Sequence, residues 1–153
     1  KAGEWDKLPS RSLSECTLGV VGVGNCGRAV LRRARAFGMH LLGNDIVEIA
    51  PDFVRENELK MTSLDDLLRR ADFVSLHCDL NPTSYHLINA HTLAQMKPEA
   101  VLINSSRGPV VDEAALVAAL QSWWLARRST RSRPRAPKSW IACPSRRRIP
   151  WMG

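Results

Sequence analysis

A glycine-rich segment near the start of the chain has the composition of a phosphate-binding loop. Residues 22–27 read Gly-Val-Gly-Asn-Cys-Gly, which is the pattern G-x-G-x-x-G. In such a loop Gly22 permits a tight turn, Gly24 lets the backbone approach a pyrophosphate, and Gly27 lets a helix pack closely on a strand. The free N–H groups at the start of that helix favour an anion. The pattern also occurs in ordinary turns, so its surroundings decide its meaning.

An acidic residue at the expected distance strengthens this interpretation. Asp45 lies 18 positions after Gly27 and is placed to accept hydrogen bonds from the hydroxyls of an adenine ribose. A 2′-phosphate there would meet a like charge, and no Arg or Lys follows Asp45 immediately, so NAD is favoured over NADP. Glu48 is a second acidic candidate, and the alternative for Asp45 is that it merely ends a strand in solvent.

The elements needed to position these residues are visible as alternating apolar runs and helical patterns. Short apolar runs cover residues 17–22, 39–42, 73–76 and 100–103, and helical spacing covers 25–37, 63–68, 89–96 and 114–120. Strands that alternate with helices predict an α/β fold with a Rossmann-type, doubly wound parallel sheet. Since a complete sheet of this type has about six strands, four visible strands predict an incomplete one.

Arg107 follows the last of these apolar runs, in the segment Asn104-Ser-Ser-Arg-Gly. Ligands bind at the carboxyl edge of open parallel sheets, where this segment is expected to lie. A guanidinium there can hold a carboxylate through two parallel hydrogen bonds and so orient a 2-oxo or 2-hydroxy acid. Composition alone favours a surface-loop arginine, and the surrounding residues reverse that preference.

The segment from His77 to Leu116 closely resembles the NAD-binding domain of the D-isomer-specific 2-hydroxyacid dehydrogenases. The resemblance is carried by the glycine loop, by Met96-Lys97-Pro98 and by the block Asn104-Ser-Ser-Arg-Gly-Pro-Val-Val-Asp-Glu-Ala-Ala-Leu116, and it runs from about Trp5 to about Gln121. The family includes phosphoglycerate, D-lactate, hydroxypyruvate and formate dehydrogenases. The resemblance implies an oxidoreductase that transfers a hydride between a D-2-hydroxy acid and NAD.

The same resemblance assigns roles to individual positions. It implies cofactor contacts from Gly22, Gly24, Asn25, Cys26, Gly27, Asp45, Cys78, Ser105 and Ser106, with Asn25 and Cys26 at the pyrophosphate, and it makes Arg107 the catalytic arginine that binds substrate. Asp79 departs from the family pattern, in which proline is usual at this position. An added carboxylate there puts the geometry of the loop formed by residues 77–79 in question.

The family also uses a histidine as proton donor or acceptor and a glutamate that tunes it, both after the arginine. The four histidines of this chain are His40, His77, His86 and His91. All of them precede Arg107, so none matches the catalytic histidine, and His77 is expected to line the cleft. We therefore expect the isolated chain to lack dehydrogenase activity and to bind NAD weakly.

The charge of the chain divides it into two parts. The formal net charge is +7, from 22 Lys and Arg against 15 Asp and Glu. Residues 1–122 contain 13 basic and 15 acidic residues, a net charge of −2, whereas residues 123–153 contain the other 9 basic residues and no acidic one. We expect a partial NAD-binding domain over residues 1–122 and a basic, unstructured tail over residues 123–153.

The tail departs from the family just where another strand is expected. It is rich in Arg, Pro, Ser and Trp, and synonymous codons exist that give a family-like strand in another frame, so we interpret it as a frameshift product. The alternative is a non-catalytic dinucleotide-sensing or nucleic-acid interaction module that uses the tail, which a steep salt dependence of binding would reveal.

Composition also limits the location and the partners. The sequence contains no apolar run of about 18 residues, so no membrane span is predicted, and the first ten residues lack the apolar core of a signal peptide. The 4 cysteines form no C-x-x-C pair, which argues against a zinc knuckle or a redox motif and is typical of reduced thiols in the cytoplasm; no metal site is expected. The expected partner is a small 2-oxo or 2-hydroxy acid, nucleic acid is not favoured, and the family suggests a homodimer.

Overall fold

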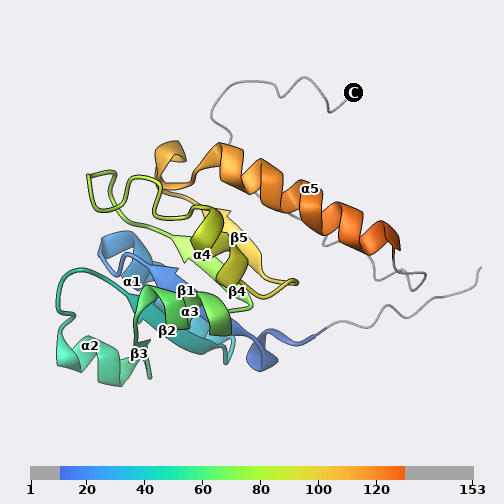
Figure 1. The fold of residues 1–153 in the computed structure, drawn as a ribbon. Helices are drawn as coiled ribbons and strands as arrows, with labels where there is room; N and C mark the ends of the chain where they lie inside the picture. The colour runs from blue at the N-terminus through green and yellow to red at the C-terminus, as the bar shows by residue number, and fades with distance from the viewer. Residues whose placement is uncertain (1–10, 130–153) are drawn as a thin grey trace, which may run out of the picture.

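The computed structural model describes residues 11–129, with side chains to residue 122. Its strands are β1 (Thr17–Val21), β2 (His40–Asn44), β3 (Lys60–Met61), β4 (Phe73–Leu76) and β5 (Val101–Asn104). Its helices are α1 (Asn25–Ala36), α2 (Pro51–Glu56), α3 (Leu64–Arg70), α4 (Ala90–Gln95) and α5 (Glu113–Ser129), with short 3-10 turns at Leu13–Glu15 and Gly108–Val110. The strands form one parallel sheet in the order β3-β2-β1-β4-β5 (Figure 1). The expected α/β fold with a Rossmann-type sheet is confirmed.

The sheet has one strand more than the four apolar runs indicated. Strand β3 contains only two residues, Lys60 and Met61, which pair with Leu42 and Gly43 of β2. Two residues show no periodicity, so the sequence gives no signal for this strand. The Asn44 side chain reinforces it by donating from Nδ2 to the Thr62 carbonyl at 2.9 Å.

The sheet is covered on both faces, and each face has its own core. Along β1 the side chains alternate, so that Val20 packs in the core formed with helices α1 and α2, and Val21 in the core formed with α3. Helices α3 and α4 lie in front of the sheet in Figure 1 and α1 lies behind it. The strands are therefore held on both sides, as parallel strands require, and only their ends are free to bind a ligand.

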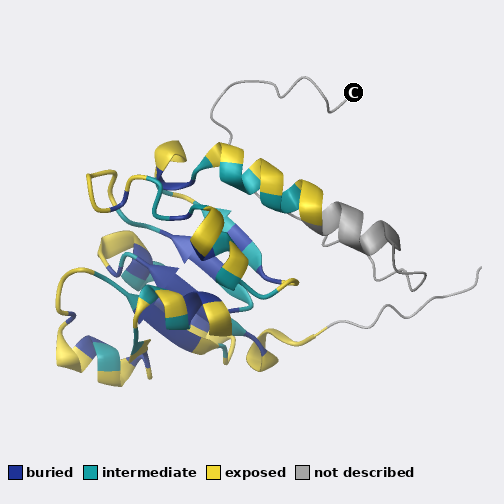
Figure 2. Cartoon of the chain, viewed as in Figure 1, coloured by how far each residue is buried: buried dark blue, intermediate teal, exposed yellow. Residues whose placement is uncertain are grey.

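Helix α5 lies beyond β5, and its residues 113–122 are exposed or half-buried (Figure 2). The Asp112 side chain caps it by accepting a hydrogen bond from the Ala115 N–H at 3.0 Å. The helix backbone continues to Ser129, past the boundary expected after Ser122. The rest of the expected tail, residues 130–153, lies outside the described residues. Among residues 11–129, no helix is long and apolar enough to cross a membrane.

Candidate functional site

The glycine loop begins where β1 ends and packs against the loop that follows β4. Gly22 has a φ of +89°, and a Cβ at this position would lie 2.6 Å from the Cys78 nitrogen. Its N–H donates to the Asn44 carbonyl of β2 at 2.9 Å. Gly22 is therefore required by the fold itself, because only glycine satisfies both the backbone conformation and the close approach.

Gly27 and Gly24 differ in what surrounds them. Gly27 is buried in the first turn of α1, and a Cβ there would overlap the carbonyl oxygen of Gly22. Gly24 is the exposed N-cap of α1, and a Cβ there would meet no atom within 4 Å. The packing of the protein thus explains Gly22 and Gly27, but it leaves open space in front of Gly24.

The start of α1 faces this open space with an uncompensated partial positive charge. Asn25 and Cys26 form its first residues and are exposed, and the first turn contains no acidic residue. The first N–H groups of a helix have no partner within the helix, and together with the helix dipole they attract an anion. The N-terminus of this 12-residue helix is thus suited to a phosphate group.

Asp45 lies directly beside the glycine loop. Its Oδ2 accepts a hydrogen bond from the Val23 N–H at 2.6 Å, and its Oδ1 accepts one from the Val47 N–H at 3.0 Å. These two bonds fix the carboxylate, and each oxygen keeps a lone pair for a ligand. Of the two acidic candidates, Asp45 is the one tethered to the glycine loop.

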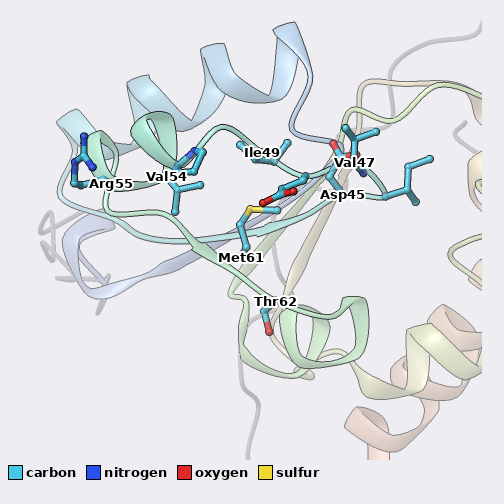
Figure 3. Close-up of a pocket in the computed structure, with 10 residues that line it drawn as sticks. Asp45, Val47, Ile49, Val54, Arg55, Met61 and Thr62 are labelled. Carbon is cyan, nitrogen blue, oxygen red and sulfur yellow. Dashed lines mark hydrogen bonds between the residues drawn. The ribbon is translucent and has the colours of Figure 1, made fainter.

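A hollow of about 580 Å³ opens next to Asp45 (Figure 3). It is lined by Asp45, Ile46, Val47, Glu48, Ile49, Pro51, Val54, Arg55, Met61 and Thr62. Ile46 is 80% exposed and Val47 is 64% exposed, so the chain leaves apolar surface bare beside the carboxylate. Sequence reasoning missed this apolar wall, although an apolar pair directly after Asp45 was a readable signal.

The segment that carries Arg107 is held by hydrogen bonds at the end of β5. The Ser106 hydroxyl donates to Oδ1 of Asn104 at 2.8 Å, and Nδ2 of Asn104 donates to the Arg107 carbonyl at 3.0 Å. The Arg107 side chain is exposed and donates from Nη1 to the Ser106 carbonyl at 3.2 Å. The backbone of Arg107 is thus fixed while most of its guanidinium donors face outward.

His77 and Cys78 connect the glycine loop to this segment. The His77 ring lies 2.8 Å from the Ser75 hydroxyl through Nε2 and 2.9 Å from the Ser105 hydroxyl through Nδ1. Burial lowers the pKa of His77 below its ordinary value. Burial also raises the pKa of the Cys78 thiol, and the carboxylates of Asp79 and Asp45 add to this effect, which a hydrogen bond with Ser106 partly opposes.

The residues singled out in the sequence therefore gather at the carboxyl edge of the sheet. Val23 contacts Asp45, Gly22 packs on Cys78, and His77 contacts Ser105, so the ends of β1, β2, β4 and β5 form one continuous surface. This is the edge at which open parallel sheets bind their ligands. The hollow lies at the Asp45 end of this edge, and Arg107 lies in the segment that follows β5.

Comparison with known proteins agrees with this arrangement. Residues 1–138 match the family model described as "D-isomer specific 2-hydroxyacid dehydrogenase, NAD binding domain". The chain is 46% identical over 110 residues to a glyoxylate reductase of Korarchaeum cryptofilum, a match that covers 72% of this chain and 33% of that protein. It is 40% identical over 126 residues to a D-3-phosphoglycerate dehydrogenase of Methanocaldococcus jannaschii, covering 79% of this chain and 24% of that protein.

A solved structure shows the same arrangement of elements. D-lactate dehydrogenase from Aquifex aeolicus, complexed with NAD and lactic acid, superposes with a TM-score of 0.72 at 38% identity, covering 79% of this chain and 36% of that one. The chain spans about a third of the length of the curated glyoxylate reductase that it matches.

Proposed function

Because this chain belongs to the D-isomer-specific 2-hydroxyacid dehydrogenase family and carries its NAD-binding domain, we propose that it binds NAD along the carboxyl edge of its sheet. The observation that carries the proposal is the open space in front of Gly24, in a loop whose other two glycines are required by packing. A glycine that the fold itself does not need is explained by a ligand that approaches the backbone. The space lies at the N-terminus of α1, where a pyrophosphate finds N–H donors.

The remaining residues of the edge fit the other parts of NAD. Asp45, fixed by two backbone N–H groups, would accept hydrogen bonds from the adenine ribose, and the apolar side chains of Ile46 and Val47 would cover the adenine. Asn25 and Cys26 would contact the pyrophosphate. Cys78, Ser105 and Ser106 would line the path toward the nicotinamide. Burial raises the pKa of the Cys78 thiol, so the neutral thiol adds no negative charge to this path.

We further propose that the chain serves the oxidation or reduction of small 2-hydroxy and 2-oxo acids. Bound NAD supplies the hydride acceptor or donor, and Arg107 orients the acid by gripping its carboxylate. Asn104 holds the Arg107 carbonyl and so fixes the backbone from which the exposed side chain extends. A proton donor is also needed, and no histidine of the 153-residue chain follows Arg107, so turnover requires groups from outside it.

The cellular setting proposed for the domain follows from its thiols and its site. Cys16, Cys26 and Cys78 are free, which suits a reducing cytoplasm. The site is built for a dinucleotide and a small acid, so small molecules rather than nucleic acid are the proposed ligands. Self-association as a homodimer is proposed from the family alone.

Titration of the 153-residue chain with NAD and NADP by calorimetry tests the proposal. We expect NAD to bind and NADP to bind at least tenfold more weakly, because its 2′-phosphate meets the Asp45 carboxylate. D45N should weaken NAD binding about tenfold or more, since hydrogen bonds to a charged group contribute roughly 1.5–3 kcal/mol.

Two matched variants show whether the effect is specific to Asp45. E48Q removes a charge from the same hollow, and D65N removes one from α3, where Asp65 accepts a hydrogen bond from Gln95. Both should bind NAD within about twofold of the wild-type chain, since only Asp45 is tethered to the glycine loop. Absence of NAD binding by the wild-type chain, or equal losses in D45N and D65N, would refute the proposed site.

A further inference from the structure

The imidazole of His77 bridges two serine hydroxyls at the carboxyl edge of the sheet. Nε2 lies 2.8 Å from Oγ of Ser75, a β4 residue that is 4% exposed, and Nδ1 lies 2.9 Å from Oγ of Ser105, just after β5. Neither serine is adjacent to His77 in the sequence. The ring therefore joins the interior of β4 to the segment that follows β5.

Counting protons favours one ring nitrogen as the carrier of hydrogen. The Ser105 hydroxyl has one proton, and it is directed to the Leu76 carbonyl at 3.0 Å. Its oxygen must then accept from His77, so Nδ1 is the protonated nitrogen. Nε2 is left as an acceptor and receives the proton of the Ser75 hydroxyl.

The other proton arrangements are less favourable. With the proton on Nε2, the Ser75 oxygen would accept from the ring and its own proton would have no acceptor among the described residues, and a buried donor left unpaired costs about 1–3 kcal/mol. A ring protonated on both nitrogens also leaves the Ser75 hydroxyl proton without an acceptor, and it adds a positive charge at a half-buried position. Burial lowers the pKa of His77, in agreement with a neutral ring.

The backbone around His77 ties β4 to both of its neighbours, β1 and β5. The His77 N–H donates to the Val21 carbonyl of β1 at 2.8 Å, and the Ser105 N–H donates to the Leu76 carbonyl of β4 at 3.3 Å. The second bond is long for an N–H···O bond. The Ser105 hydroxyl, which bonds the same Leu76 carbonyl, therefore has a large share in holding the start of the Arg107 segment.

We propose that His77 is a positioning residue of the NAD site, whose neutral ring, protonated on Nδ1, holds the Ser105 hydroxyl and through it the segment 104–107. The inference rests on the proposed function, in which Ser105 and Ser106 line the cofactor path and Arg107 binds the acid. His77 itself acts through Ser105. Ser75, although buried in β4, sets the tautomer that makes this possible.

Two amide variants separate positioning from mere filling of space. In H77N the side-chain amide stands near the place of Nδ1 and keeps a donor for Ser105, whereas in H77Q the amide reaches toward Ser75 and loses Ser105. We expect H77Q to speed amide hydrogen exchange at Ser105 and to weaken NAD binding about threefold to tenfold, the effect of one neutral hydrogen bond. H77N should stay within about twofold of the wild-type chain in both measurements.

The ring itself provides a readout that needs no cofactor. Nitrogen-15 spectra of the wild-type chain should show a protonated Nδ1 and an unprotonated Nε2 at neutral pH. Protonation on Nε2, or equal effects of H77N and H77Q on Ser105 exchange, overturns the proposal. If the wild-type chain binds no NAD, the proposed function fails, while the ring spectrum and the Ser105 exchange still decide whether His77 positions the segment.

Discussion

Gly24→Ala is expected to remove most of the NAD affinity while leaving the fold intact. Gly24 has φ of −76° and ψ of −159°, an extended conformation that alanine can adopt, and the new Cβ would meet no atom within 4 Å. Alanine is a poorer N-cap than glycine by roughly 0.5–1 kcal/mol. Alanine also restricts the unfolded chain more than glycine does, which stabilises the fold by about 0.4–1 kcal/mol and offsets the loss at the N-cap. The free energy of unfolding should therefore change by less than about 1 kcal/mol.

The effect on binding is larger because the methyl group projects into the space proposed for the pyrophosphate. A phosphate pushed away by the width of a methyl group loses one or more hydrogen bonds from the first turn of α1. Each hydrogen bond to a charged group contributes about 1.5–3 kcal/mol. NAD binding should therefore weaken roughly tenfold to a hundredfold for each bond lost.

Gly27→Ala is the matched comparison within the same loop. Its Cβ would overlap the Gly22 carbonyl oxygen, which is backbone and moves only with the whole loop. Overpacking of this kind destabilises a fold by about 1–3 kcal/mol. Urea unfolding and calorimetric NAD titration of both variants separate the two roles. A folded G24A chain with wild-type NAD affinity, or one destabilised as much as G27A, would show that the reasoning is wrong.

Three further predictions concern stability and the gene. The pKa of His77 lies below its ordinary value of 6.5, so the unfolded chain takes up this proton first as the pH falls. The contribution of His77 to stability is therefore full above pH 6.5 and is lost below it. H77N should show a smaller change in urea midpoint between pH 7.5 and 5.5 than the wild-type chain. The Asp72 carboxylate, 14% exposed, accepts hydrogen bonds from the Thr17 N–H, Lys97 and Arg11, so D72A should lower the free energy of unfolding by about 2 kcal/mol. D52A removes the exposed ion pair between Asp52 and Arg55 and should cost less than about 0.5 kcal/mol. Equal losses of stability in the two variants would contradict this. Sequencing of the gene should find a family-like strand in another frame from codon 123 onward, and its absence rules out the frameshift.

The pH dependence of Asp72 has the opposite origin from that of His77. Burial alone would raise the pKa of this carboxyl, but the bonds from the Thr17 N–H, Lys97 and Arg11 outweigh burial and lower it below its ordinary value of 3.8. The stabilisation by Asp72 is therefore complete above pH 3.8 and is lost as the pH falls through the lowered pKa. His77 acts near neutrality and Asp72 only in acid, so the two effects can be measured separately.

The sequence predicted those parts of the site that depend on local backbone requirements. A glycine loop between a buried strand and a helix is a local pattern, and Asp45 follows the next strand, so parallel pairing alone brings the two together. The end of α1 and the start of α5 are also set locally, since Gly38, with φ of +73°, follows α1 and Asp112 caps α5. The two-residue strand β3 was not predictable, because it exists only through pairing with β2.

The hydrogen-bonded bridge through His77 was beyond sequence reasoning for a similar reason. It depends on the register of β4 with β5, which sets Leu76 opposite Asn104 and so brings Ser105 to the ring. A histidine after a buried strand suggests a cleft residue, but nothing local shows which nitrogen is protonated or what it holds. Tertiary pairing supplies that information, and no pattern within one segment contains it.

This dependence on register has a consequence for substitutions far from the ligand. Ser75 lies within a buried strand and by position alone counts as core, yet its hydroxyl proton fixes the His77 tautomer. Ser75→Ala fills nearly the same volume and should change stability little, but it frees Nε2 to hold the proton and Nδ1 to become an acceptor. Ser105 would then turn its proton from Leu76 to His77, and its amide should exchange faster. We therefore expect S75A to loosen the Arg107 segment without unfolding the sheet, because the site is built from the ends of neighbouring strands.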